Sequence, residues 1–266
     1  MPTIVLALAM IAQPMPADGP VPRPTATTGR VAGRLTWGGA AVPPSTADWD
    51  GLRADSAAAY PDRPDDLRID PATRGIAHGF AFLVDPKGDY TATERRFLDE
   101  HPTVTIRSRG QQITPFAAIA HRDQVPTYVD DDPEGHILRV DNFIIEPGRM
   151  LPEKGNIDQS RYLAGKFHQA GPRHPILRLS CDIHPIERSY FLKVAHPFAT
   201  TTQADGSFKL VDVPTGEQRL VVWHPAGGWL TPNGLRGMPI TVPDAGGVAD
   251  IGALVIRPAS KKKNKP

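Results

Sequence analysis

The segment Pro175-Ile-Leu-Arg-Leu-Ser-Cys-Asp-Ile-His-Pro-Ile-Glu-Arg-Ser-Tyr-Phe-Leu-Lys-Val194 decides the fold predicted for this chain. Residues 175–180 and 190–194 are short and rich in apolar side chains, which is typical of buried β-strands. The loop between them carries Cys181 and His184, three residues apart. A thiolate and an imidazole on a loop between two rigid strands can both turn toward one metal ion. The segment therefore predicts a β-fold with a metal-ligand loop.

Short apolar segments separated by turn residues continue on both sides of this loop. The turn Gln203-Ala-Asp-Gly206 is one example, where glycine permits a positive φ angle. In chain order the expected strands are residues 31–37, 75–84, 104–106, 116–120, 125–129, 137–140, 175–180, 190–194, 199–202, 207–211, 218–223, 238–242 and 251–256. A short helix is expected from Thr91 to His101, capped by Thr91 or Thr93. The predicted fold class is all-β.

Composition limits the classes of partner. The 266 residues are long enough for two modest domains, each with its own core. The 30 basic and 29 acidic residues leave a net charge of +1, so no overall field favours nucleic acid. Cys181 is the single cysteine, which excludes an intramolecular disulfide framework and leaves metal binding as one explanation for the thiol.

The two ends of the chain differ from the patterned middle. The apolar run Ile4–Ala12 resembles the hydrophobic part of a signal peptide, and nine residues are too few to span a bilayer, which needs about twenty. We therefore expect a signal peptide at 1–18, a linker at 19–29 and a basic tail at 259–266. The protein is expected in the periplasm, secreted or in the cell envelope, with no integral membrane segment after signal removal.

A third metal ligand lies upstream of the loop. The acidic turn Asp130-Asp-Asp-Pro-Glu-Gly135 leads into His136, which precedes the expected strand at 137–140. A His₂Cys copper site needs one distant histidine, the cysteine, a nearby histidine and a weak axial ligand. His136, Cys181 and His184 occur in that order.

Several stretches resemble a known family. Leu179-Ser-Cys-Asp-Ile-His-Pro185 is similar to the copper-ligand loop of cupredoxin-like proteins of the methylamine-utilization and plastocyanin-like group. Gly75-Ile-Ala-His-Gly-Phe-Ala-Phe-Leu83 resembles a strand of that family, and Asp130–His136 resembles the segment that carries its first copper histidine. The stretch from His196 to Phe208 resembles the start of the carboxypeptidase regulatory-like module that often follows.

The resemblance implies two β-sandwiches and a copper ion. It places a cupredoxin-like Greek-key sandwich at 30–196 and a smaller transthyretin-like or carboxypeptidase regulatory-like sandwich at 197–258. Residues 31–37 fit either sandwich. The implied function is copper binding through His136, Cys181 and His184, with electron transfer to a redox partner protein.

The chain departs from the family at the ligands themselves. Glu187 stands where the family has its axial methionine, and Ile137 stands where it has an asparagine after the first histidine. A carboxylate is a harder ligand than a thioether and disfavours Cu(I). Glu187 is thus either a fourth ligand or a residue that points to water.

Two other interpretations stay open. The first is a non-enzymatic binding module of the envelope or cell surface whose metal site has degenerated. The second is a hydrolase that holds zinc at the same ligands and uses Glu187 as its general base. Catalysis is not expected in the leading interpretation. His196 and His224 precede prolines at strand ends and are interpreted as turn residues.

Overall fold

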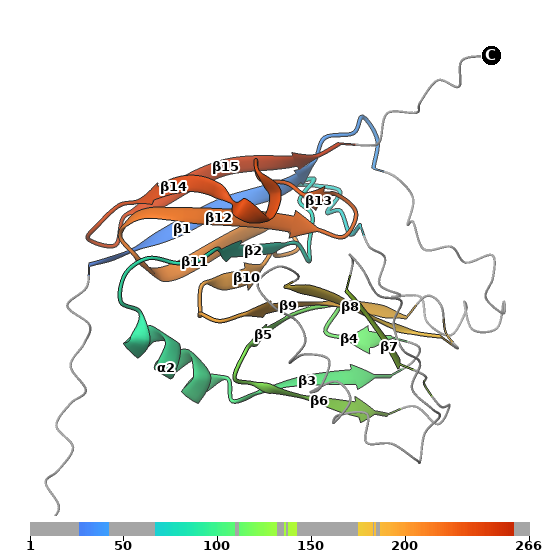
Figure 1. Ribbon diagram of the computed structural model, residues 1–266. Helices are drawn as coiled ribbons and strands as arrows, with labels where there is room; N and C mark the ends of the chain where they lie inside the picture. Colours follow the sequence, from blue (N-terminus) through green and yellow to red (C-terminus); the bar gives the residue numbers. More distant parts are fainter. Residues whose placement is uncertain are drawn as a thin grey trace, which may run out of the picture.

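The all-β fold class is confirmed: strands make up most of the structure (Figure 1). The structure is a computed structural model that describes residues 27–42, 67–109, 112–131, 136, 138–142, 175–182, 184 and 187–257. The expected signal peptide, most of the linker and the basic tail lie outside these residues. In the described part, no helix has the length and apolar character required to cross a membrane.

Strands of the described residues form four sheets. Sheet 1 has the order β11 (Ser207–Pro214), β1 (Thr28–Trp37), β15 (Val248–Ile256). Sheet 2 has the order β10 (Ala199–Thr201), β2 (Phe80–Leu83), β12 (Gly216–His224), β13 (Gly228–Trp229), and β14 (Met238–Val242) also pairs with β12. Sheet 3 has the order β5 (Ala117–His121), β9 (Arg188–Val194), β8 (Ile176–Cys181), β7 (Leu138–Asn142). Sheet 4 has the order β4 (Ile113–Thr114), β3 (Thr103–Ser108), β6 (Val125–Asp130).

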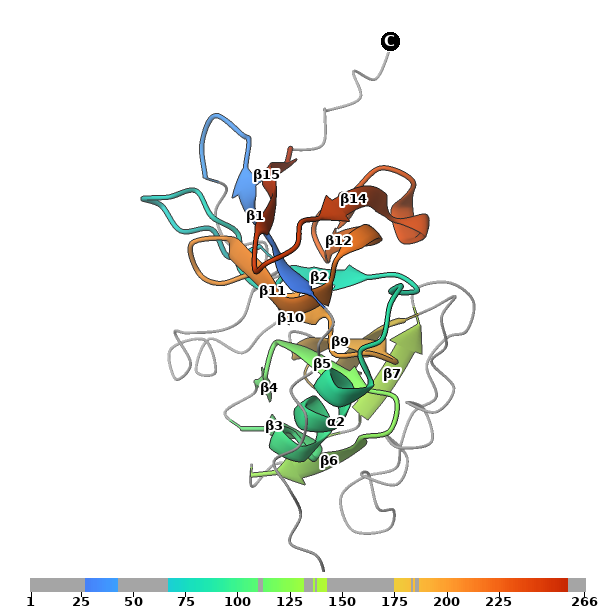
Figure 2. The same cartoon turned by 90° about the vertical axis from the view of Figure 1, so that its left-hand side faces the viewer.

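The sheets stack in the order 1, 2, 3, 4, with a hydrophobic core between each neighbouring pair (Figure 2). Side chains alternate across a strand, so each of the two inner sheets contributes side chains to two cores. On β12, Leu220 and Val222 belong to the core between sheets 1 and 2, whereas Val221 and Trp223 belong to the core between sheets 2 and 3. Both faces of β12 are therefore buried in a core, which explains why both are apolar.

Chain order and sheet membership do not coincide. The sequence left residues 31–37 open between the two sandwiches and placed residues 75–84 in the first; β1 pairs with β11 and β15, and β2 pairs with β10 and β12. Both N-terminal strands therefore lie in the sheets of the C-terminal strands. The buried side chains of Val31 on β1 and Leu83 on β2 join the core between sheets 1 and 2, which explains this pairing.

The strand expected at residues 75–84 is wrong in its first half. Regular pairing begins only at Phe80, because His78 has φ of 66° and breaks the extended backbone. Before it, Gly75 forms an isolated bridge with Thr36. A β-carbon on Gly75 would lie 1.9 Å from backbone atoms of Asp205, so the close approach of two chain segments requires glycine there.

Helix α2 (Thr91–Glu100) connects β2 to β3, close to the predicted bounds (Figure 1). The predicted threonine cap is wrong, since the amide of Thr91 donates to Oδ1 of Asp89 instead. The helix is tied to sheet 3 by Glu94, whose Oε1 lies 2.9 Å from Nε2 of the buried His121.

Candidate metal centre

A buried polar group lies at one end of the core between sheets 3 and 4. Its residues come from β6, from the position before β7, and from the loop between β8 and β9. Leu138 of β7 pairs with Cys181 of β8, and both side chains are buried. His136 lies two residues before Leu138 and has no exposed surface. The strand register thus brings the distant histidine to the loop that carries the cysteine.

Backbone hydrogen bonds close the loop between β8 and β9. The amide of Glu187 donates to the carbonyl of His184 at 2.9 Å, and the amide of Cys181 donates to the carbonyl of Glu187 at 3.2 Å. These bonds make a tight turn that holds three side chains close together. Glu187 is fully buried, and the His184 side chain is 13% exposed, so the turn presents its functional groups toward the protein interior.

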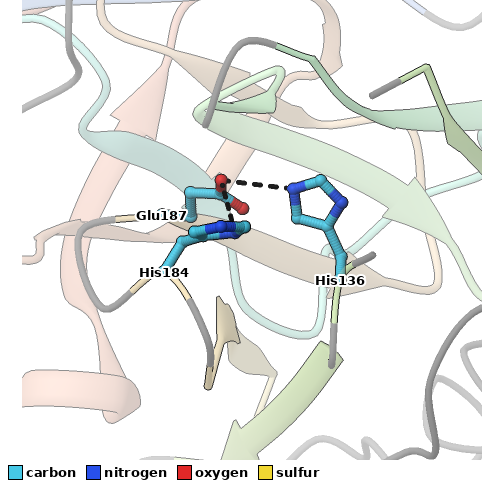
Figure 3. A group of neighbouring side chains, drawn as sticks. All are labelled: His136, His184 and Glu187. Carbon is cyan, nitrogen blue, oxygen red and sulfur yellow. Dashed lines mark hydrogen bonds and ion pairs between the residues drawn. The ribbon is translucent and has the colours of Figure 1, made fainter. Parts of the chain in front are cut away.

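One carboxylate oxygen lies between two imidazoles (Figure 3). Oε1 of Glu187 is 3.3 Å from Nε2 of His136 and 3.3 Å from Nδ1 of His184. The ligand atoms of these three residues all lie within 4.8 Å of one another. Sγ of Cys181 is 3.6 Å from the same Nδ1 of His184, which places the thiol beside the group.

Asp130 orients the His136 ring. Nδ1 of His136 lies 3.0 Å from Oδ1 of Asp130, whose side chain is only 10% exposed. In the tautomer that carries its proton on Nδ1, the His136 ring donates to this carboxylate oxygen. In the neutral ring Nε2 then has a lone pair, and this lone pair faces Glu187. The arrangement matches the carboxylate–histidine pairs that orient metal ligands in proteins.

The converging atoms are all electron-pair donors in their metal-binding forms. Lone pairs of Nε2, Nδ1 and Oε1 face one another, so each contact requires a proton or a metal cation between the two atoms. Within the described residues, Oε2 of Glu187 is buried and has no hydrogen-bond partner. A buried carboxylate normally has such partners or coordinates a metal. An oxygen in this state can accept a hydrogen bond or coordinate a cation.

The spacing agrees with tetrahedral coordination. Two atoms bound at about 2.1 Å with a tetrahedral angle lie about 3.4 Å apart, and a nitrogen and a sulfur bound at about 2.0 and 2.3 Å lie about 3.5 Å apart. The observed separations are 3.3 Å for the two nitrogen–oxygen pairs and 3.6 Å for nitrogen and sulfur. These three pairs are therefore near ligand spacing, whereas Cys181 does not belong to the group of His136, His184 and Glu187, whose ligand atoms all lie within 4.8 Å of one another.

Tyr128 is buried and lies near the site, where Asp130, Glu187 and Cys181 act on it electrostatically. Its hydroxyl donates to Oγ of Ser108 at 2.8 Å, and both residues are buried. Burial raises the pKa of the Tyr128 phenol well above its usual range, and the charges of Asp130 and Glu187 act in the same direction. The phenol thus stays neutral.

The four predicted ligands do not lie equally close to one another. His136, His184 and Glu187 form the group with the shortest mutual spacing, whereas Cys181 adjoins it through His184. The oxygen of Glu187, which the sequence left as ligand or surface residue, lies at the centre. Sequence analysis missed Asp130 as the partner of His136. Its signal was the acidic turn itself, because Asp130 begins the segment that leads into His136.

Two other histidines accept hydrogen bonds within turns. The sequence had suggested this role, because each precedes a proline at a strand end. Nδ1 of His196 accepts from the amide of Phe198 at 3.2 Å, and Nδ1 of His224 accepts from the amide of Ala226 at 3.1 Å. Burial lowers the pKa of each imidazole to about 4. Both rings are therefore neutral at pH 7 and act as turn acceptors.

No family model, curated protein or solved structure matches this chain.

Proposed function

We propose that this protein binds one copper ion through His136, His184 and Glu187, with the thiolate of Cys181 as the fourth ligand. The observation that carries the proposal is the position of Glu187 Oε1, buried and 3.3 Å from one nitrogen of each histidine. Asp130 would hold the His136 ring so that Nε2 faces the metal. His136, His184 and Glu187 are already close together, and Cys181 would approach the metal from its position beside His184.

The donor set favours Cu(II) among the divalent ions. Imidazole suits both copper and zinc, and affinities for a given site of nitrogen, oxygen and sulfur ligands rise to a maximum at Cu(II). Zinc is the alternative metal, because it accepts the same tetrahedral ligands. When bound, copper would supply a redox-active centre with a thiolate-to-metal absorption band.

Electron transfer is a weaker proposal than metal binding. The hard carboxylate of Glu187 stabilises Cu(II) over Cu(I) and so opposes a fast redox couple. The zinc hydrolase is also less favoured, because Glu187 contacts both imidazoles and thus takes a ligand position rather than that of a general base. A binding protein that holds its copper in one oxidation state fits the ligands better.

The two kinds of sandwich implied by the sequence are part of the proposal. Sheets 3 and 4, which carry every residue of the metal centre, correspond to the cupredoxin-like unit. Sheets 1 and 2 correspond to the carboxypeptidase regulatory-like unit. The core between sheets 2 and 3, which includes Phe80, Tyr190 and Trp223, would join them.

The test is to load the purified, reduced protein with Cu(II) and to measure metal stoichiometry and visible absorption. We expect one copper ion per chain and a thiolate-to-copper band that Cys181→Ser removes. Glu187→Gln is expected to weaken binding at least tenfold, because an amide is a poorer ligand than a carboxylate. His101→Gln, an exposed histidine outside the site, is the matched control and should bind as the wild type does.

Two results would contradict the proposal. One is a copper stoichiometry that stays the same in His136→Gln and His184→Gln, which would place the metal elsewhere. The other is retention of zinc in the presence of excess Cu(II), which would assign the site to zinc. Absence of any metal binding would support the degenerate module.

A further inference from the structure

Strand β15 forms one edge of sheet 1 (Figure 1). It pairs with β1 on one side, and among the described residues no strand pairs with its other side. An edge strand offers unpaired amide and carbonyl groups to another chain, and proteins often protect such an edge with lysine, proline or a very short strand. β15 has nine residues and contains neither lysine nor proline. Its free edge can therefore accept a further strand.

The backbone groups of alternate residues of β15 point to this free edge. The carbonyl of Ile256 accepts the amide of Gly38, which directly follows β1, so the backbone groups of Ile256 point toward β1. Successive residues of a strand point their N–H and C=O groups to opposite sides. Those of Val255 and Ala253 therefore point away from β1, toward the free edge.

The edge also exposes apolar side chains on both faces of the strand. Val255, on the outer face of sheet 1, is 41% exposed. Ile251 and Leu254 pack against the core between sheets 1 and 2 and are only partly buried. A strand added to this edge would cover part of each of these side chains. The edge thus combines free backbone groups with apolar surface.

Asp250 and Arg257 are the charged residues of this edge. Both are exposed, and neither forms an ion pair with the part of the chain that the structure describes. Oδ1 of Asp250 accepts the amide of Gly252 at 2.9 Å, which holds the carboxylate at a fixed place in the strand. A β-carbon on Gly38 would contact the side chains of both Val255 and Arg257, so Arg257 continues the outer face of β15.

A second copy of the chain fits this edge in one antiparallel register. With a twofold axis at Leu254, this residue faces its own counterpart. Val255 then lies opposite Ala253 of the second copy and exchanges hydrogen bonds with it, because the backbone groups of both point to the edge. The pairing of β15 with β1 shifts by one residue at Ile251 and Gly252, which marks a β-bulge. Two residues of a bulged strand lie opposite one residue of the neighbouring strand.

The same register joins the two charges. Because of the bulge, Ile256 lies opposite Ile251 and Gly252 together, and Arg257 therefore lies opposite Asp250 of the second copy. Without the bulge, Arg257 would face Ile251 instead. The twofold axis repeats the contact, so each end of the strand pair has one ion pair. Opposite charges on directly facing residues stabilise a strand pair, and like charges destabilise it.

We propose that this protein forms a homodimer through the free edge of β15, with the two β15 strands antiparallel and sheet 1 continued from one copy into the other. The backbone groups of Val255 and Ala253 supply the pairing, and the ion pairs of Asp250 with Arg257 select the register. Such a strand pair buries less surface than a standard protein interface, so the dimer is reversible, with a dissociation constant in the micromolar range. The interface is separate from the metal centre, which lies at the core between sheets 3 and 4.

The test is sedimentation velocity of the full chain at concentrations from about 1 to 100 μM, where we expect a monomer–dimer equilibrium. Asp250→Arg and Arg257→Asp should each weaken dimerisation at least tenfold, because each places like charges opposite one another. The double variant reverses both ion pairs and should restore the dimer. Asp99→Arg is the matched control, because it makes the same charge change at an exposed position of α2, and it should dimerise as the wild type does.

Val255→Pro tests the backbone contact. Proline lacks an amide N–H, and the N–H of Val255 points away from β1, so the variant keeps the hydrogen bonds within sheet 1. We expect it to stay monomeric at every concentration, with the thermal unfolding temperature of the dilute wild type. In the wild type, hydrogen exchange of the Val255 and Ala253 amides should slow as the protein concentration rises.

Four results would overturn the proposal. They are a wild type that stays monomeric at about 100 μM, a dimer that Val255→Pro leaves unchanged, and a double charge variant that does not restore the dimer. The fourth is protection of the Val255 and Ala253 amides in the dilute monomer, because another segment of the same chain would then cover the edge.

Discussion

Replacing Asp130 with asparagine removes one negative charge next to the metal centre and keeps the side-chain shape. The amide introduced by Asp130→Asn still offers a carbonyl oxygen to Nδ1 of His136, so the ring can keep its orientation. The hydrogen bond loses its charge assistance, because its acceptor is now neutral. The substitution thus separates the effect of charge from the effect of position.

The expected loss of metal affinity follows from the contact between His136 and Asp130. The Nδ1–Oδ1 distance is 3.0 Å, the His136 side chain has no exposed surface and that of Asp130 is 10% exposed, so solvent screens this bond little. Loss of such a partner lowers metal affinity about 10- to 100-fold, or about 1.4 to 2.7 kcal/mol. We expect Asp130→Asn at the lower end, since the hydrogen bond survives, and Asp130→Ala at the upper end.

The assay is competition for Cu(II) against a chelator of known affinity. The metal-free protein supplies a second measurement, because ¹⁵N NMR of the imidazole reports which nitrogen of His136 carries the proton. We expect a protonated Nδ1 in the wild type and in Asp130→Asn, and a mixture of tautomers in Asp130→Ala. Asp131→Asn is the control, since Asp131 pairs with Arg107 at the surface.

Two results would refute the reasoning. If Asp130→Ala binds copper within twofold of the wild type, Asp130 does not support a ligand. If the NMR spectrum shows a protonated Nδ1 in Asp130→Ala as well, another contact fixes the tautomer. The NMR result is independent of copper binding, so it tests the role of Asp130 even if the metal proposal fails.

Three further predictions concern stability and are measured by urea unfolding. Between pH 7 and pH 5 the free energy of unfolding should fall by about 2 kcal/mol for each of His196 and His224, whose pKa is lowered to about 4. The sign follows because the unfolded chain binds the extra protons; a fall that His224→Gln leaves unchanged would contradict it. Gly75→Ala should cost about 3 kcal/mol, because the new methyl group would overlap the backbone of Asp205; unchanged stability would show that the two segments can separate. Phe191→Ala should cost about 3 to 5 kcal/mol, because Phe191 is fully buried between sheets 3 and 4; a loss below about 1 kcal/mol would mean that the core collapses around the cavity.

Short apolar strands bounded by clear turns could be predicted from the sequence alone. Residues 207–211 and 218–223 lie inside β11 and β12, because apolar runs and the turns that flank them are local properties of the chain. The segment 75–79 is apolar as well, yet it is not part of a regular strand. The bridge from Gly75 to Thr36 depends on a segment distant in sequence, which no local pattern contains.

Some features of the candidate site, too, could be predicted from the sequence, and others could not. The sequence by itself determined the all-β class and the candidate ligands His136, Cys181, His184 and Glu187. Both follow from local properties, because ligand chemistry depends on residue identity and strand periodicity depends on residue spacing. Only the tertiary structure decided that Glu187 Oε1 lies between the two imidazoles, that Asp130 orients His136, and that β1 joins the C-terminal strands. These depend on strand register and sheet stacking, which are set by the burial of side chains far apart in the chain.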